Sequence, residues 1–349
     1  LGMVLTPGQA RAQLVPGAGA EAPLTDQYTQ VLTGNYCYVT GGNSLILVDS
    51  ADFEINVPGT PVAAYWVWSS RVILGSGDSF PDPVDNTLTV TGTRGDGAAI
   101  NTEITATIQE ESTFSGYIRS YAFVYSDNLF DFVSQGLNAY TISGIDVPAF
   151  EIPESHGAAL TIVYEADSCP YQQIDLAYGL DTFYHDWAPP FGPDSVVACV
   201  AFAPATEART LSYTVIVAGA AQPEVADATR PSGFWTAAVN SPDGVPPASL
   251  VGEAFATGIV DPFNSTPGLE WDIYSGQVAL AAGDNYACFQ AESPVGDGAP
   301  GGISGAWLNL TTGTPLALGS IGDTVWADLN GNGAQDQGEA CLLYTSPSP

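Results

Sequence analysis

Residues 100–108 read Ile-Asn-Thr-Glu-Ile-Thr-Ala-Thr-Ile, and this pattern decides the fold class. Isoleucine stands at 100, 104 and 108, while the odd positions hold small or polar side chains. Successive side chains of a β-strand point to opposite faces, so the period of two predicts one face in a core and one in water. Further stretches rich in β-branched and aromatic residues occur at 62–68, 117–125, 158–164, 195–202, 211–217 and 306–310.

Turn-forming residues separate these stretches throughout the chain, which contains 38 Gly and 26 Pro. Clusters such as Gly75-Ser-Gly-Asp78 and Ser241-Pro-Asp-Gly244 are typical of tight turns. No helical periodicity extends beyond two turns. Many short strands with frequent turns predict an all-β protein of β-sandwich or jelly-roll type.

A weak internal repeat indicates two related modules. Residues 130–143 lead to a strand at 156–163, and residues 271–289 lead in a similar way to a strand at 304–310. We therefore expect one β-sandwich module at 37–190 and a second at 191–318, with the Pro-rich stretch 188–193 as their boundary. One larger continuous sandwich is the alternative.

The charge of the chain excludes some partners. The 349 residues include 38 acidic and six basic side chains, all six of them Arg, and the net charge is −32. Nucleic-acid binding and docking on anionic lipid both require clustered basic residues, so we expect neither. An acidic surface suits a salty habitat or the loading of cations in an extracellular matrix. Because 45% of the residues are hydrophobic, the chain can still form a large core.

The two ends carry segments outside the modules. Residues 1–12 end in Ala10-Arg11-Ala12 and match the end of a secretory signal peptide. We expect an extended linker at 13–36 and a non-native tail at 341–349. No later run of 18 apolar residues occurs, so the sequence predicts no membrane insertion within this chain.

Four cysteines remain when the tail is set aside, namely Cys37, Cys169, Cys199 and Cys288. An even number in a secreted chain suggests two disulfides, for which three connectivities exist. Our preferred pairing is Cys37–Cys169 with Cys199–Cys288. Four buried free thiols are the alternative.

Residues 321–339 contain the pattern of a calcium-binding loop, D-x-[DN]-x-[DN]-G-x5-E, which starts at Asp328. Calcium takes six to eight oxygen ligands, and the glycine at position 6, Gly333, permits the sharp turn that brings alternate residues inward. The predicted Ca2+ ligands are Asp328, Asn330, Asn332, the carbonyl of Ala334, Asp336 through a water molecule, and bidentate Glu339.

The flank of this loop, Asp323-Thr-Val-Trp326, has the pattern of a strand and not of a helix. Residues 322–339 resemble the opening of the B-type (SdrD B-like) domain of serine–aspartate-repeat adhesins. The resemblance implies a calcium-stiffened β-sandwich used as a stalk, of which 319–340 would be the start. The body, 37–318, resembles a domain of unknown function in prokaryotic surface proteins, which supplies no catalytic residues.

Other features have weaker functional readings. His156 and His185 are too few and too isolated for a hydrolase motif. Arg94-Gly95-Asp96 has the form of a cell-adhesion tripeptide, but it lies in a glycine-rich turn, where this combination of residues is expected by chance. A second cation site in the acidic loop of Asp78, Asp82 and Asp85 is one hypothesis, and a plain acidic loop is the preferred alternative. A glycan-binding face of aromatic residues is another, although most of them should belong to the core. These aromatic residues are Tyr65, Trp66, Trp68 and Trp187.

Together these features predict a secreted or cell-surface, non-enzymatic, adhesin-like protein with a calcium-stiffened stalk. Its surface ligand or glycan is unknown. One alternative is a carbohydrate-binding or accessory module of an extracellular hydrolase. Another is a self-associating subunit of an extracellular filament, which would exchange residues 13–36 as a strand.

Overall fold

The computed structural model describes residues 21–316, except 76, 116–117, 128, 146–151, 186, 188–190, 220–229, 242–243 and 295–301. Within this part the chain is all-β, as the sequence predicted, and its helical elements are the 3-10 turns η1 (Leu24–Asp26) and η2 (Leu129–Asp131). The strands are β1 (Tyr28–Ser44), β2 (Ser50–Val57), β3 (Thr60–Ile73), β4 (Thr87–Thr93), β5 (Ala99–Thr105), β6 (Ile108–Ser115), β7 (Ile118–Tyr125), β8 (Gly136–Ser143), β9 (Ile152–Glu165), β10 (Tyr171–Phe183), β11 (Ala198–Ala201), β12 (Arg209–Ala218), β13 (Gly233–Val239), β14 (Thr257–Val260), β15 (Pro267–Gly268), β16 (Trp271–Leu280), β17 (Tyr286–Glu292) and β18 (Gly305–Pro315).

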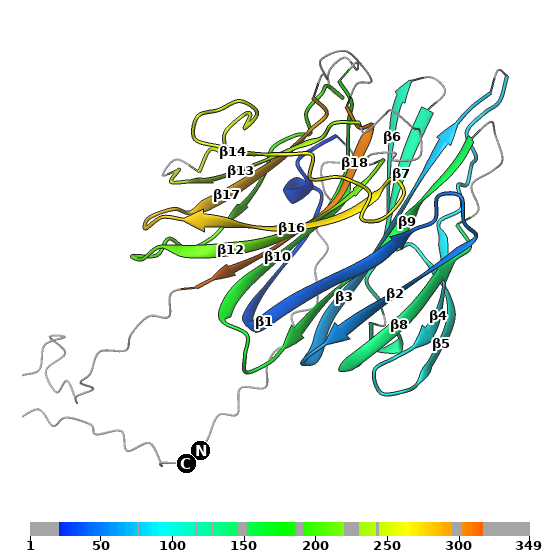
Figure 1. Ribbon diagram of the computed structural model, residues 1–349, viewed down its shortest axis with the longest axis horizontal. Helices are drawn as coiled ribbons and strands as arrows, with labels where there is room; N and C mark the ends of the chain where they lie inside the picture. Colours follow the sequence, from blue (N-terminus) through cyan, green and yellow to red (C-terminus); the bar gives the residue numbers. More distant parts are fainter. Residues whose placement is uncertain are drawn as a thin grey trace, which may run out of the picture. The chain divides into compact units, whose positions relative to one another are not determined.

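The strands form one long sheet and two short ones (Figure 1). The long sheet has the order β15-β16-β12-β18-β10-β1-β9-β3-β7-β6, and the short sheets have the orders β11-β17-β13-β14 and β2-β8-β4-β5. Strand β1 joins the two parts of the long sheet. Its residues Tyr28–Asn35 pair with β10, and its residues Tyr36–Ser44 pair with β9.

Each part of the long sheet is covered by one short sheet. In the first sandwich, β2-β8-β4-β5 packs on β9-β3-β7-β6 around a core that includes Trp66, Trp68 and Phe123. In the second sandwich, β11-β17-β13-β14 packs on β15-β16-β12-β18-β10 around a core that includes Phe234 and Trp307.

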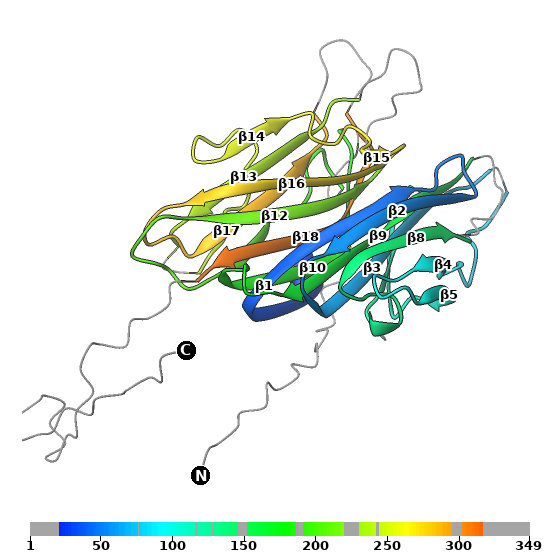
Figure 2. The same cartoon turned by 60° about the horizontal axis from the view of Figure 1, so that its bottom comes forward.

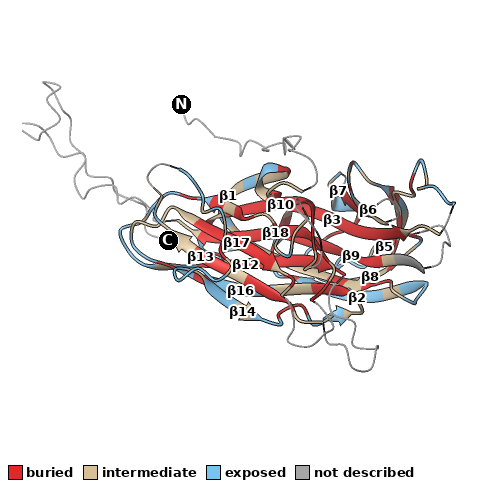
Figure 3. Ribbon diagram, turned by 90° about the horizontal axis from the view of Figure 1, so that it is seen from above, coloured by how far each residue is buried: buried red, intermediate tan, exposed pale blue. Residues whose placement is uncertain are grey.

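The two parts of the long sheet also pack against each other, through the faces that the short sheets leave uncovered. A third apolar cluster joins β3, β7 and β9 of the first sandwich to β10, β12 and β18 of the second. At its centre the rings of Tyr65 (β3) and Tyr178 (β10) stack with their centroids 5.1 Å apart. Figure 3 shows this burial along β3, β9, β10 and β18, whereas β14 at the rim is exposed. Four sheet layers therefore follow one another through the molecule.

The structure adds detail to the expected organisation. Residues 28–36, which we expected within a linker, form the first part of β1. Strand β10, which we expected in the module at 37–190, pairs with β18 and contributes to the core of the second sandwich. The stretch 100–108, which we expected as one strand, is divided between β5 and β6, because the chain bends at Thr107 and moves to another sheet: Ala106 N still bonds Asn86 O beside β4, whereas Thr107 N bonds Val124 O of β7.

Both preferred disulfides are present. Cys199 and Cys288 are directly paired residues of β11 and β17. Cys37 lies two residues beyond the point where β1 changes partner, and Cys169 lies in the connection between β9 and β10. The Cys37–Cys169 disulfide therefore fixes the place where the two sandwiches share a strand.

A short N-terminal segment closes an irregularity in β10. Pairing between β10 and β18 shifts register between Tyr178 and Asp181, so Leu180 lacks a strand partner there. The buried side chain of Gln27 replaces that partner. Its Oε1 accepts a hydrogen bond from Leu180 N at 2.8 Å, and its Nε2 donates to Leu180 O at 3.2 Å. The carboxamide thus satisfies Leu180 N, which would otherwise be buried and unpaired, and adds a second donor to Leu180 O, which also accepts a hydrogen bond from Glu21 N at 3.1 Å.

A buried carboxyl on β10 makes stability depend on pH. Asp175 is 8% exposed, and burial raises its pKa from 3.8 to about 6, although Gln173 and Thr312 donate hydrogen bonds to it. A raised acid pKa means that the folded state binds more protons than the unfolded state between these two values. The stabilisation is therefore present below the unfolded pKa and is lost as the pH rises through about 6.

We expect Asp175→Asn to remove this dependence. The free energy of unfolding of the wild-type protein should fall relative to that of Asp175→Asn by up to about 3 kcal/mol between pH 4 and pH 7.5, from 1.36 kcal/mol per pKa unit. Urea denaturation of both proteins across this range measures the difference. Two parallel curves would contradict the assignment.

Candidate functional site

A groove of about 630 Å3 lies beside the contact between the two sandwiches, where the outward face of the second sandwich is no longer covered by the first. Six strands contribute residues to it, namely β16, β12, β18, β10, β1 and β9, and the first five run in this order across Figure 2. Its lining residues are Cys37, Tyr38, Tyr164, Pro170, Gln172, Thr210, Ser212, Tyr213, Thr214, Ser275, Gly276, Gln277, Gly313 and Pro315.

The sequence of β12 explains why the groove is polar. Alternate residues of this strand, such as Tyr213 and Val215, face the core of the second sandwich. On the opposite face, Ile216 joins the apolar contact between the sandwiches, whereas Ser212 and Thr214 lie in the groove. The outward face therefore changes from apolar to hydroxyl-bearing at the point where the first sandwich ceases to cover it.

Strand β16 shows the same change. Ile273 packs against the contact between the sandwiches, and the next outward residues, Ser275 and Gln277, are exposed in the groove. Thr214 and Ser275 hydroxyls lie 2.7 Å apart, which links the two strands through their side chains. We did not identify these residues from sequence, but the change of outward residues along 212–216 and 273–277 is a signal that could have found them.

The floor of the groove is built around Gly313. A Cβ atom at this position would lie 3.0 Å from Gln172 Oε1, 3.0 Å from Ser212 Oγ and 3.3 Å from the ring of Tyr38. Three polar side chains from three strands therefore converge on one glycine. Gln172 is itself held, because its Nε2 donates to the carbonyl of Tyr36 at 2.6 Å. Its Oε1 is consequently positioned as an acceptor.

The groove carries no formal charge. None of its lining residues is an acid, a histidine, a lysine or an arginine. Burial raises the pKa values of Tyr38 and Tyr164, so both phenols remain neutral hydrogen-bonding groups at physiological pH. In a chain of net charge −32, this groove offers hydroxyls, amides and aromatic rings without a carboxylate.

The predicted calcium loop lies outside the described residues, as do the signal remnant at 1–12 and the tail at 341–349. Asp328, Asn330, Asn332, Ala334, Asp336 and Glu339 therefore remain a prediction. Within the described ranges, no three His, Cys, Asp or Glu side chains gather closely enough to hold a metal ion. The acidic loop of Asp78, Asp82 and Asp85 is thus not assembled as a cation site; Asp85 instead accepts hydrogen bonds from Thr87.

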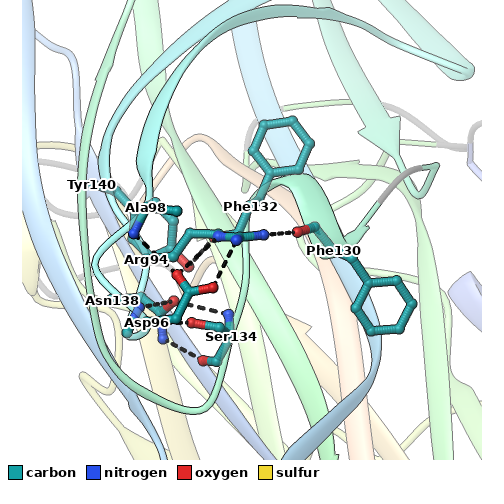
Figure 4. Close-up of polar contacts among 9 residues, drawn as sticks. Arg94, Asp96, Ala98, Phe130, Phe132, Ser134, Asn138 and Tyr140 are labelled. Atoms are coloured by element: carbon teal, nitrogen blue, oxygen red, sulfur yellow. Dashed lines mark hydrogen bonds and ion pairs between the residues drawn. The ribbon is translucent and has the colours of Figure 1, made fainter.

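The Arg94-Gly95-Asp96 tripeptide is tied into the turn between β4 and β5 (Figure 4). Arg94 Nη2 lies 2.7 Å from Asp96 Oδ2, so the two charged side chains pair with each other. The main chain of Asp96 donates to Ser134 Oγ at 2.8 Å, and Gly97 adopts a φ of +86° that closes the turn. Because the two charges are paired within the turn, this geometry counts against its use as an adhesion signal.

The two histidines have different surroundings. His156 Nδ1 lies 3.2 Å from Ser69 Oγ, but both residues are fully buried, so a substrate cannot reach them. His185 is half-buried beside the ring of Tyr184, whose centroid lies 4.3 Å from its own.

The aromatic candidates separate into two groups. Tyr65, Trp66 and Trp68 are at most 2% exposed and belong to the core, as expected for most of them. Trp187 is half-buried in the loop between β10 and β11, and its ring contacts Tyr184 and Phe191.

Comparisons with known proteins leave the function open. No protein-family model matches the chain, and no curated protein matches it. PNGase F, a glycosylasparaginase from Flavobacterium meningosepticum, is similar at 12% identity and a TM-score of 0.26, over 82% of this chain and 96% of that chain. A peptide-N(4)-(N-acetyl-β-D-glucosaminyl) asparagine amidase is similar at 12% identity and a TM-score of 0.24, over 82% and 98%. At this level of similarity, function has to be argued from the residues themselves.

The two disulfides indicate an oxidising compartment and so support the predicted extracellular location. In the described part of the chain, no helix has the length and hydropathy that a membrane crossing requires.

Proposed function

We propose that this chain is an extracellular, non-catalytic binding protein whose groove between the two sandwiches takes an uncharged saccharide. The observation that carries the proposal is the convergence of Gln172, Ser212 and Tyr38 on Gly313 in a groove without charged side chains. Sugars present closely spaced hydroxyls and apolar C–H faces. Hydroxyl and amide side chains bond the former, and tyrosine rings pack against the latter.

The same lining residues favour binding over catalysis. Glycoside hydrolysis uses a pair of carboxyl groups beside the scissile bond. Acyl transfer uses a nucleophile with an adjacent base. The groove contains serine and threonine hydroxyls but no carboxylate or imidazole beside them. This composition also agrees with the adhesin-like reading of the sequence.

Two groove variants test the site. We expect the wild-type protein to bind at least one member of a panel of neutral oligosaccharides in isothermal titration calorimetry. Gly313→Ala should weaken that binding about tenfold or more, because its methyl group enters the space in which three side chains converge. Tyr164→Ala should weaken it by a similar factor through loss of an aromatic wall. The matched control is Thr105→Ala on the exposed edge strand β5, which should leave the affinity unchanged.

Failure of the wild-type protein to bind any neutral oligosaccharide at millimolar concentration would remove this function. Equal affinity in the wild-type protein and both groove variants would place the binding elsewhere.

We further propose that Asp328–Glu339 binds Ca2+ and stiffens the connection that follows the second sandwich. Support comes from the complete ligand pattern in the sequence and from the extracellular setting, where millimolar calcium suits modules of this kind.

Calorimetric titration with CaCl2 of a chain that contains the complete module should show one site. Asp328→Ala with Glu339→Ala should abolish it, because these variants remove the first ligand and the bidentate ligand. Heat of binding that is the same before and after both substitutions would contradict the assignment.

A further inference from the structure

A second cavity, of about 450 Å3, lies on the first sandwich and has a different chemistry. It is formed by β6, β7 and the segment that precedes β4. Seven of its lining residues matter for its chemistry, namely Phe80, Asp82, Asn86, Gln109, Glu111, Arg119 and Tyr121. Unlike the groove, this cavity is lined by a positively charged side chain, that of Arg119.

Arg119 is held in a fixed position. Its guanidinium lies over the ring of Phe80, 4.2 Å from the centroid. Its Nε donates to Thr113 Oγ1 at 2.7 Å, and its Nη1 donates to Glu111 Oε2 at 3.3 Å. An arginine held on three sides loses little further side-chain entropy when it binds a ligand.

One nitrogen of this guanidinium, Nη2, has no acceptor among the described residues, and its neighbour Nη1 has only the long contact to Glu111. By comparison, Arg71 donates to the carbonyl of Ser304 at 2.8 Å, and Arg209 donates to that of Pro315 at 2.6 Å. Those two arginines fasten the main chain, whereas Arg119 lines a cavity.

A second donor lies close to Arg119. Tyr121 is 1% exposed and lines the same cavity, and its hydroxyl makes no hydrogen bond of normal geometry with a described residue, although it is near enough to Arg119 to interact with it. Burial raises the pKa of Tyr121, and the hydrogen bonding and the charge of Arg119 oppose that rise. The phenol therefore remains protonated, and two donors lie together at the floor of a polar cavity.

We propose that this cavity binds a sugar that carries a carboxylate, of the uronic-acid class. The planar carboxylate matches the two-donor edge of a guanidinium. The hydroxyls of the sugar ring match the acceptors and amides of Asp82, Asn86 and Gln109 on the surrounding wall.

The ion pair already present does not oppose this binding strongly. The side chain of Glu111 is 50% exposed, and exposed pairs contribute little to stability. A ligand carboxylate can therefore replace Glu111 beside Arg119 while Glu111 turns to solvent. The proposal is independent of the groove, since the two cavities share no lining residue.

The test is calorimetric titration of the full chain with D-glucuronate and D-galacturonate, and with glucose and galactose as the uncharged counterparts. We expect at least one uronate to bind and its uncharged counterpart to bind at least about tenfold more weakly. Arg119→Gln should reduce uronate affinity by about tenfold or more, as loss of a charge-assisted hydrogen bond predicts. Glu111→Gln should increase it several-fold, because it removes the competing carboxylate.

Arg94→Gln is the matched control, since Arg94 is similarly exposed but lies in a closed turn, and it should leave uronate affinity unchanged. If Arg119→Gln does not fold, Glu111→Gln still tests the proposal. Uronate binding by Glu111→Gln that is unchanged or weaker than that of the wild-type protein overturns the proposal. Equal binding of uronates and neutral sugars also overturns it. Gly313→Ala should not affect uronate binding, so failure here is distinct from failure at the groove.

Discussion

Gln27→Leu is expected to lower the free energy of unfolding by about 1–3 kcal/mol, because leucine cannot accept the hydrogen bond that Leu180 N donates, whereas Leu180 O still accepts one from Glu21 N. In the wild-type protein the Gln27 carboxamide bonds both Leu180 N and Leu180 O, and it also donates to Ala22 O at 2.7 Å. Gln27 is 1% exposed, so water cannot replace the lost contacts. Each buried main-chain group left unpaired costs about 1–3 kcal/mol.

Chemical denaturation followed by circular dichroism measures this change. The matched control is Gln135→Leu, an exposed glutamine whose Nε2 donates to one carbonyl, that of Pro58, at 3.0 Å. We expect that variant to change stability by no more than about 1 kcal/mol. A loss of stability in Gln27→Leu no larger than that of the control would show that Leu180 finds another partner.

Removal of the Cys37–Cys169 disulfide should destabilise the protein by about 3–5 kcal/mol. The two residues are 132 positions apart, and a loop of that length loses much entropy when it is closed in the unfolded chain. The double variant Cys37→Ala with Cys169→Ala, compared with the wild-type protein in guanidinium denaturation, measures the effect. It should also weaken saccharide binding, because Cys37 lines the groove and fixes β1 beside it.

The corresponding variant without Cys199–Cys288 gives a matched comparison. Its loop of 89 residues predicts a loss within about 0.5 kcal/mol of the first, since loop entropy rises only with the logarithm of length. That disulfide is not among the groove residues, so saccharide affinity should remain. Loss of stability below about 1 kcal/mol in the first variant, or loss of binding in the second, would contradict these roles.

The strands were predictable from the sequence because apolar and polar residues alternate along them, and this alternation shows which side chains are buried. Ile100 and Ile104 do enter a core, and the pairing of the four cysteines was inferred correctly. The alternation of apolar and polar residues does not show, however, which of the sheets a strand packs against. Ile108 continues the spacing of Ile100 and Ile104, yet it packs between the two sandwiches while they pack inside the first.

The groove could not be predicted for a related reason. Its residues come from six strands, several of them distant in sequence, and they meet because β1 pairs with β10 over one half and with β9 over the other. Nothing in the local pattern of 28–44 marks that change of partner. Gly313 appears in the sequence as one glycine among 38, and its role follows only from the side chains around it.

The position of β18 sets the order in which the molecule can fold. This last described strand lies between β10 and β12, in the interior of the long sheet and not at its edge. Neither neighbour can complete its pairing until residues 305–315 have emerged from the ribosome or the secretion channel. The first part of β1 likewise waits for β10, more than 130 residues later. Contacts so distant along the chain predict slow folding, with a stage at which β10 and β12 still lack the strand that lies between them.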